Sequence, residues 1–169
     1  MKRILLFGLA TSLSLSLLGC TIEAGKGKEK VDVHNQIEQQ IDEDKLNNER
    51  ITSLIEDFGS RLQRVSLLSP IDVLEKSMKE SYGDFVSQTL LEKWIKDPEN
   101  APGRRTSSPW PDRIEIQSIE KLSEEEYEIK GNIIEITSSK EDKAIHIPIK
   151  LNVKKIEDKW VIDDVILAE

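Results

Sequence analysis

The chain has 169 residues with 24 basic and 32 acidic side chains, which gives a formal net charge of −8. A protein with this negative charge repels the phosphates of nucleic acids and anionic lipid headgroups. Nucleic acid is therefore not an expected partner. The length fits one ordinary domain with a short tether, and the single cysteine has no partner for an intramolecular disulfide.

The first twenty residues have the layout of an exported leader. Lys2 and Arg3 precede an apolar run from Ile4 to Leu18, which is too short for a comfortable membrane span. The run ends in Leu17-Leu18-Gly19-Cys20, a motif that resembles the lipobox of bacterial lipoproteins.

The resemblance to bacterial lipoproteins implies that residues 1–19 are a signal peptide and that Cys20 carries a thioether-linked diacylglycerol. Two acyl chains give stable membrane attachment, whereas one gives only marginal attachment. We therefore expect an extracytoplasmic protein, anchored by the lipid on Cys20 at the outer face of the cytoplasmic membrane. The alternative is an uncleaved N-terminal anchor with an incidental cysteine.

Residues 20–48 are predicted to be the lipidated cysteine and a polar tether. The first part of this stretch mixes glycine and lysine with few apolar groups, a composition that does not form a core. Val33, Ile37 and Ile41 then recur every four residues, which is compatible with a weak amphipathic helix. A solvated tether is the preferred interpretation, followed by one domain over residues 49–169.

Three helices open the predicted domain. Apolar residues from Ile51 to Val65 follow the spacing of one helical face, and Gly59 within them indicates close packing. Ser69-Pro70 predicts the start of a second helix, with the serine as N-cap, and Tyr82-Gly83 predicts its end. Ser87 predicts the cap of a short third helix. The side chains expected to be buried on the second and third helices are Ile71, Leu74, Met78, Leu90, Leu91 and Trp94.

Strands follow a proline-rich loop. Residues 97–112 contain four prolines and are predicted to be neither helix nor central strand. Beyond the loop, apolar and polar residues alternate, which predicts antiparallel strands with one solvated face. Gly131 predicts a bulge. The predicted strands lie at 114–117, 127–136, 145–154 and 160–167, with turns at 138–142 and 157–159.

Helices followed by antiparallel strands define an α+β domain, in which N-terminal helices pack on one face of a curved sheet of about four strands. The closing segment, Leu151 to Lys155 and then Asp158 to Asp163 with Trp160-Val161-Ile162, resembles the cone-shaped NTF2-like (cystatin-like α+β) fold. The resemblance covers roughly residues 49–167. That superfamily includes enzymes, ligand binders and scaffolds, so the resemblance implies a fold and no active site.

The sequence carries no signature of catalysis or cofactor binding. His34 and His146 lack a metal-ligand spacing, and Ser107-Ser108 lacks the motif of a nucleophile. The acidic clusters at Glu124–Glu126 and Asp163-Asp164 are interpreted as a turn and a solvated strand end. No catalytic residue, cofactor or metal is therefore predicted.

The segment 102–111 is the candidate contact surface. Arginine and tryptophan dominate interface hot spots, and flanking prolines reduce the ordering cost of binding. Arginine also grips a carboxylate or phosphate at two points. The alternative is a structural loop, in which the tryptophan packs on the core and the arginines pair with nearby acids. The candidate contact residues are Arg104, Arg105, Ser107, Ser108 and Trp110.

The sequence favours a lipid-anchored binding or scaffold domain without catalytic activity that contacts an envelope protein or another envelope component. A small-molecule binder that uses the cone interior, with Arg104 or Arg105 at its mouth, is the alternative. A hydrolase or isomerase is the third hypothesis, and it requires a polar pocket with a buried acid or histidine.

Overall fold

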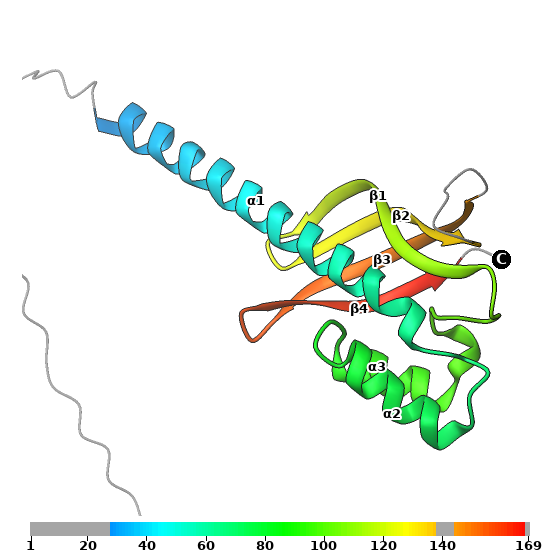
Figure 1. Cartoon of the computed structure of the whole chain (residues 1–169). Helices are drawn as coiled ribbons and strands as arrows, with labels where there is room; N and C mark the ends of the chain where they lie inside the picture. The colour runs from blue at the N-terminus through cyan, green and yellow to red at the C-terminus, as the bar shows by residue number, and fades with distance from the viewer. Residues whose placement is uncertain (1–27, 138–143, 168–169) are drawn as a thin grey trace, which may run out of the picture. The chain divides into compact units, whose positions relative to one another are not determined.

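The structure, a computed structural model, describes residues 28–137 and 144–167, with side chains described from residue 39 onward. The chain divides into two compact units, Met1–Glu38 and Gln39–Glu169, and the packing below concerns the second. There, three helices pack on a four-stranded antiparallel sheet (Figure 1), which confirms the predicted α+β fold class. Cys20 and the predicted turn at 138–142 lie outside the described residues.

The elements follow one another without a crossover. The helices are α1 Lys28–Arg61, α2 Ile71–Tyr82 and α3 Gln88–Lys96, with 3₁₀-helices at Leu62–Arg64 and Pro98–Asn100. The strands are β1 Trp110–Ser123, β2 Glu126–Ile136, β3 Ile145–Ile156 and β4 Lys159–Leu167. Each strand pairs antiparallel with the next, so β1 and β4 are the sheet edges. Consequently β1 begins and β4 ends at one end of the sheet, and the β1–β2 and β3–β4 hairpins lie at the other (Figure 1).

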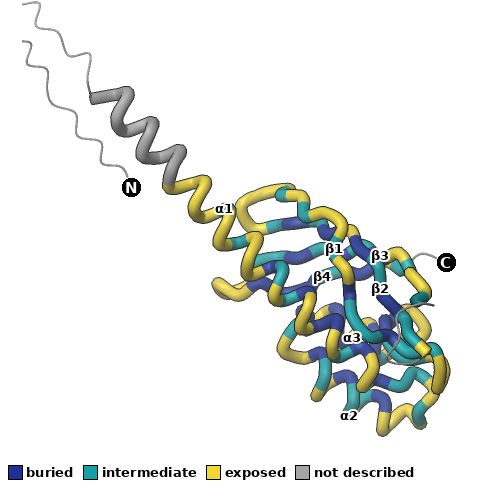
Figure 2. Tube along the Cα trace, turned by 45° about the horizontal axis from the view of Figure 1, so that its top comes forward, coloured by how far each residue is buried: buried dark blue, intermediate teal, exposed yellow. Residues whose placement is uncertain are grey.

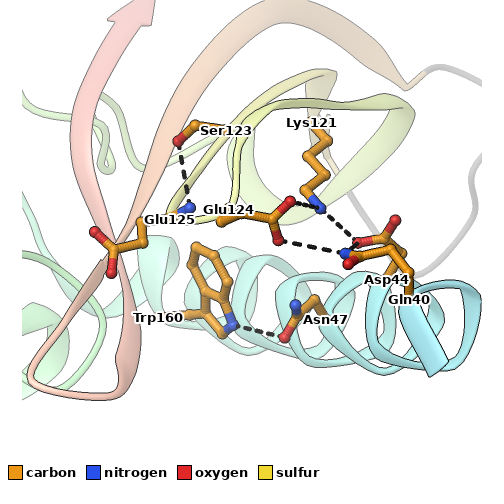
Figure 3. Close-up of polar contacts among 8 residues, drawn as sticks. All are labelled: Gln40, Asp44, Asn47, Lys121, Ser123, Glu124, Glu125 and Trp160. Carbon is orange, nitrogen blue, oxygen red and sulfur yellow. Dashed lines mark hydrogen bonds and ion pairs between the residues drawn. The ribbon is translucent and has the colours of Figure 1, made fainter. Parts of the chain in front are cut away.

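Helix α1 begins well before the expected start near Glu49. It is helical from Lys28, so the stretch 28–48 differs from the coil that the composition favoured. The side chains that fix this part of the helix are polar: Trp160 Nε1 donates to Asn47 Oδ1 at 3.3 Å (Figure 3). The weak helix that the spacing of Val33, Ile37 and Ile41 allowed as the alternative to a tether is thus observed.

A polar clamp ties α1 to the β1–β2 hairpin (Figure 3). Lys121 Nζ lies 2.7 Å from Asp44 Oδ1 and 2.8 Å from Glu124 Oε1, and Gln40 Nε2 donates to both carboxylates. The hydrogen bond from Lys121 holds the pKa of the Asp44 carboxyl below its ordinary value and raises the pKa of Lys121. Lys121 and Asp44 are partly buried and Glu124 is exposed, so water still reaches the clamp and its contribution to stability is modest.

Helix α1 meets the β1 backbone at Gly59. A Cβ on Gly59 would lie 2.6 Å from the backbone nitrogen of Ile114, a separation that real Cβ atoms do not reach. The close packing predicted for this glycine is therefore confirmed. The absence of a side chain lets the helix lie directly on the strand.

An aromatic cluster fills the core between the helices and the sheet. Phe58 of α1, Tyr82 of α2 and Trp94 of α3 are each at most 1% exposed. The ring centroids of Phe58 and Tyr82 lie 5.2 Å apart, and those of Tyr82 and Trp94 lie 5.8 Å apart, both in edge-to-face geometry. Figure 2 shows the buried positions along the strands and along one side of each helix. The side chains of the aromatic cluster fill the space between the helices and this part of the sheet.

The helix caps follow the sequence at one site and not at the other. Ser87 Oγ accepts from the Leu90 amide at 3.2 Å, as predicted. The expectation for Ser69 was wrong, because Pro70 occupies the N-cap and its carbonyl accepts from Leu74 N at 2.9 Å. Ile71, expected in the core, is 61% exposed because it opens the helix ahead of the buried stripe.

The proline-rich loop is shorter than expected. Strand β1 starts at Trp110, inside the range predicted as loop, and Pro111 is tolerated because β1 is an edge strand. The bulge expected at Gly131 lies instead on the facing strand, where the register shifts between Ile116 and Ser118. Gly131 is still required there, since a Cβ would lie 2.5 Å from the Glu115 carbonyl oxygen.

Replacement of Gly59 by alanine is expected to destabilise the protein. A Cβ cannot fit against the rigid β1 backbone, and overpacking of this kind costs about 1–3 kcal/mol even though alanine favours helix. Urea unfolding followed by tryptophan fluorescence measures the change in the free energy of unfolding. Ser53→Ala, at an exposed position of the same helix, is the matched control and should change stability by less than about 0.5 kcal/mol. An equally stable Gly59→Ala protein would contradict the packing.

Candidate functional site

A pocket of about 720 Å³ lies at the end of the sheet where β1 begins and β4 ends. Residues of α3, of the segment 99–105 and of all four strands line it, and we call it the strand-end pocket. The volume falls in the range of about 300–1,000 Å³ that is usual for small-ligand sites.

The floor of the strand-end pocket is apolar. Ile133 and Ile147 face each other across β2 and β3, and Val165 and Leu167 continue the same surface onto β4. These residues occupy the core-facing positions of their strands, where Ile129 and Leu151 face the helices farther along. The floor is therefore the end of the core face, beyond the aromatic cluster.

The segment 99–105 forms a fixed wall opposite β4. Tyr82 Oη donates to the Pro102 carbonyl at 2.8 Å from within the core, and burial raises the pKa of this phenol. The Arg104 amide donates to the Val65 carbonyl at 2.8 Å, and the Arg104 carbonyl accepts from Leu67 N at 2.9 Å. A Cβ on Gly103 would lie 3.0 Å from the Val65 oxygen, which leaves little room for any other residue.

Two opposite charges face each other inside the strand-end pocket. Arg105 extends from the wall and its guanidinium donates to the Glu99 carbonyl. Glu135 lies on β2, two residues after Ile133 and on the same face of the strand. Burial raises the pKa of its carboxyl, although the positive charge of Arg105 acts in the opposite direction. Arg105 is thus held by the backbone rather than by a carboxylate within hydrogen-bond distance, which leaves its charge available to a ligand.

An ion pair forms part of the rim. Lys93 Nζ of α3 lies 3.3 Å from Asp164 Oδ1 of β4, and both side chains are about half exposed, at 59% and 48%. Such a pair contributes little to stability. Both residues are in the lining of the strand-end pocket, so the pair marks where α3 and β4 meet at its rim.

The structure separates the residues that the sequence grouped as a contact surface. Arg105 lines the strand-end pocket, whereas the backbone of Arg104 pairs with the segment 65–67. Ser107 and Ser108 are exposed and lie outside the pocket lining. Trp110 is half-buried at the start of β1, opposite Ile136, and also lies outside the lining.

The sequence reasoning missed Glu135, Lys93 and the β4 residues of the pocket. Glu135 is one polar residue among several in an alternating strand, and the structure places it in the lining of the strand-end pocket. A usable signal existed for Glu135, since it shares the parity of Ile129 and Ile133 and so points to the core face.

Other kinds of site receive no support from the part of the chain that the structure describes. In these ranges no three side chains of metal-binding types gather in one place. Among the described helices, none combines the length and the apolar composition that a membrane crossing requires. His146 is exposed on β3.

Comparison with solved structures finds similar architectures. An NTF-2-like protein of unknown function from Shewanella oneidensis MR-1 is 14% identical, with a TM-score of 0.40, over 70% of this chain and 99% of that chain. A protein of unknown function from Bacteroides thetaiotaomicron VPI-5482 is 13% identical, with a TM-score of 0.41, over 80% of this chain and 98% of that chain. No protein-family model and no curated protein matches the sequence.

These likenesses assign no function. The described part of the chain has three helices followed by a four-stranded antiparallel sheet, which is an α+β arrangement.

Replacement of Glu135 by glutamine is expected to stabilise the protein at neutral pH. Burial raises the pKa of this carboxyl above its ordinary 4.5, so the folded state disfavours the charged form and loses stability as pH rises through that range. The melting temperature of Glu135→Gln should exceed that of the wild type at about pH 7 and match it at about pH 3.5. Glu120→Gln, at an exposed position on β1, is the control for loss of a carboxyl. A constant difference between Glu135→Gln and wild type at both pH values would show that charge burial is not the cause.

Proposed function

We propose that this protein is a lipid-anchored domain without catalytic activity that binds an envelope component in the strand-end pocket. The observation that supports this most is the combination of an apolar floor with a fixed arginine at the wall. Binding sites commonly pair apolar area, which gives affinity, with a few placed polar groups, which give orientation.

The rigidity of the wall favours binding. Hydrogen bonds from Tyr82 and between Arg104 and the 65–67 segment hold the backbone on both sides of Gly103. A ligand that meets Arg105 therefore does not have to order the loop that carries it, and the entropic cost of binding falls.

The proposed anchor rests on the N-terminal motif. Leu17-Leu18-Gly19-Cys20 follows a basic start and an apolar run, and a diacylglycerol on Cys20 would supply the two chains that stable attachment needs. The acidic domain would then be held at the membrane by lipid while its own charge keeps it off anionic headgroups.

A small-molecule ligand is the second candidate. The volume of about 720 Å³ suits a small molecule with an apolar body, and Arg105 would hold a carboxylate or phosphate on it.

Replacement of Cys20 by serine is expected to release the protein from membranes. The wild type should partition into the detergent phase of a Triton X-114 extraction and carry the mass of a chain that begins at a lipidated Cys20. Without lipid, the variant should move to the aqueous phase. A wild-type protein with an unmodified Met1 would overturn the proposed anchor.

Replacement of Arg105 by alanine is expected to lower binding by about tenfold, since a charge-assisted hydrogen bond contributes about 1.5–3 kcal/mol. Crosslinked pull-down from native membranes with wild type, Arg105→Ala and Ser107→Ala measures the recovery of bound components. Ser107 is exposed on the same loop outside the pocket lining, so its replacement is the control. Equal recovery with all three proteins would show that the pocket is not the binding site.

A further inference from the structure

The outer edge of β4 is already used for strand pairing along its first half. Ser87 N donates to the Ile162 carbonyl at 2.8 Å, and Ile162 N donates to the Phe85 carbonyl at 2.9 Å. The segment 85–87 thus runs parallel to β4 and forms a bridge at Val86 and Ile162. This edge therefore accepts an extended backbone as a fifth strand.

The second half of the same edge faces the strand-end pocket. Within the described ranges, residues 164–167 pair with β3 and with no strand on their outer side. All four line the pocket, as does the segment 99–105. The backbone edge of β4 and the wall therefore border the same pocket.

The pleat of β4 shows which backbone N–H and C=O groups point to its outer edge. In a strand, side-chain face and hydrogen-bonding edge both alternate with a period of two, so residues on one face direct their amides to one edge. The register shift at Asn152 adds one residue to β4, after which Val165 and Leu167 share the core face with Ile162. Their N–H and C=O groups consequently point to the edge where Ile162 meets the segment 85–87.

We propose that an extended peptide segment of an envelope protein binds in the strand-end pocket by adding as a strand to β4 at Val165 and Leu167. This proposal rests on the proposed binding function and names its partner. An extended chain supplies donors and acceptors at the spacing of the edge, as the segment 85–87 does one step earlier. Every second side chain of the peptide then lies on the core face beside Val165 and Leu167, at the β4 side of the apolar floor.

The test begins with a random heptapeptide library displayed on phage and panned against the full chain in detergent micelles. Selected peptides should carry apolar residues at alternating positions and should compete with one another. Amide hydrogen exchange then reports the contact: Val165 and Leu167 are expected to gain protection when the selected peptide binds. Selection of no peptide above background, or no added protection at these amides, overturns the proposal.

Two variants at one position separate the backbone contact from the side chain. Val165→Ala keeps the amide N–H, whereas Val165→Pro removes it and is compatible with an edge strand. Affinity for the selected peptide should fall by about tenfold more in the proline variant than in the alanine variant. Equal affinities overturn strand addition. If the proline variant does not fold, the hydrogen-exchange result on the wild type decides.

Failure of this proposal is distinguishable from failure of the proposed function. A pocket that binds only small molecules gives no library peptide, while Arg105→Ala still lowers recovery in the pull-down relative to Ser107→Ala. Pairing of two copies through β4 gives protection at Val165 and Leu167 that depends on protein concentration without peptide. Either result rules out an extended peptide as the partner, and neither contradicts the proposal that the pocket is a binding site.

Discussion

The contact between Gly59 and the backbone of β1 at Ile114 determines how the remaining elements can pack. With no Cβ between them, α1 lies directly on the first strand and covers the core face along that side. The helix is held at the hairpin end by Asn47 and Trp160. Beside β4 the core face is covered by α3, and the segment 99–105 lines the strand-end pocket together with the strand ends. The strand-end pocket is the part of the core face that these elements leave uncovered.

The buried aromatic cluster connects this packing to the wall of the pocket. Phe58, Tyr82 and Trp94 each come from a different helix, so burying their rings fixes the three helices relative to one another. The Tyr82 hydroxyl donates a hydrogen bond to the Pro102 carbonyl, which belongs to the segment 99–105. A buried hydroxyl without a partner costs about 1–3 kcal/mol, so this hydrogen bond favours one position of the segment 99–105. The position of Arg105 therefore depends on core packing.

Sequence patterns predicted the parts of the fold that depend on burial and missed those that depend on polar contacts. The stripe from Ile51 to Val65 and the alternation of the strands reflect apolar surface, and both were found. The early part of α1 was only the less favoured alternative to a tether, because its apolar stripe is thin and because Asp44 and Asn47 act through polar contacts with distant strands. For the site, the segment with Arg105 was found by composition alone. Which arginine lines the pocket could not be found, because the pairing of Arg104 with residues 65–67 joins parts of the chain far apart in sequence.

The two edges of the sheet are protected differently, and this difference bears on function. Exposed edges invite unwanted pairing, and proteins blunt them with bulges, prolines or cover. Strand β1 carries three register shifts and Pro111, and α1 lies against it. The segment 85–87 pairs with the first half of the β4 edge. The second half borders the strand-end pocket, with Lys93 and Asp164 at the rim. A recess excludes broad surfaces such as another sheet and admits a narrow chain. Among the described residues, the second half of β4 is thus an unpaired stretch of edge whose surroundings limit what can pair with it.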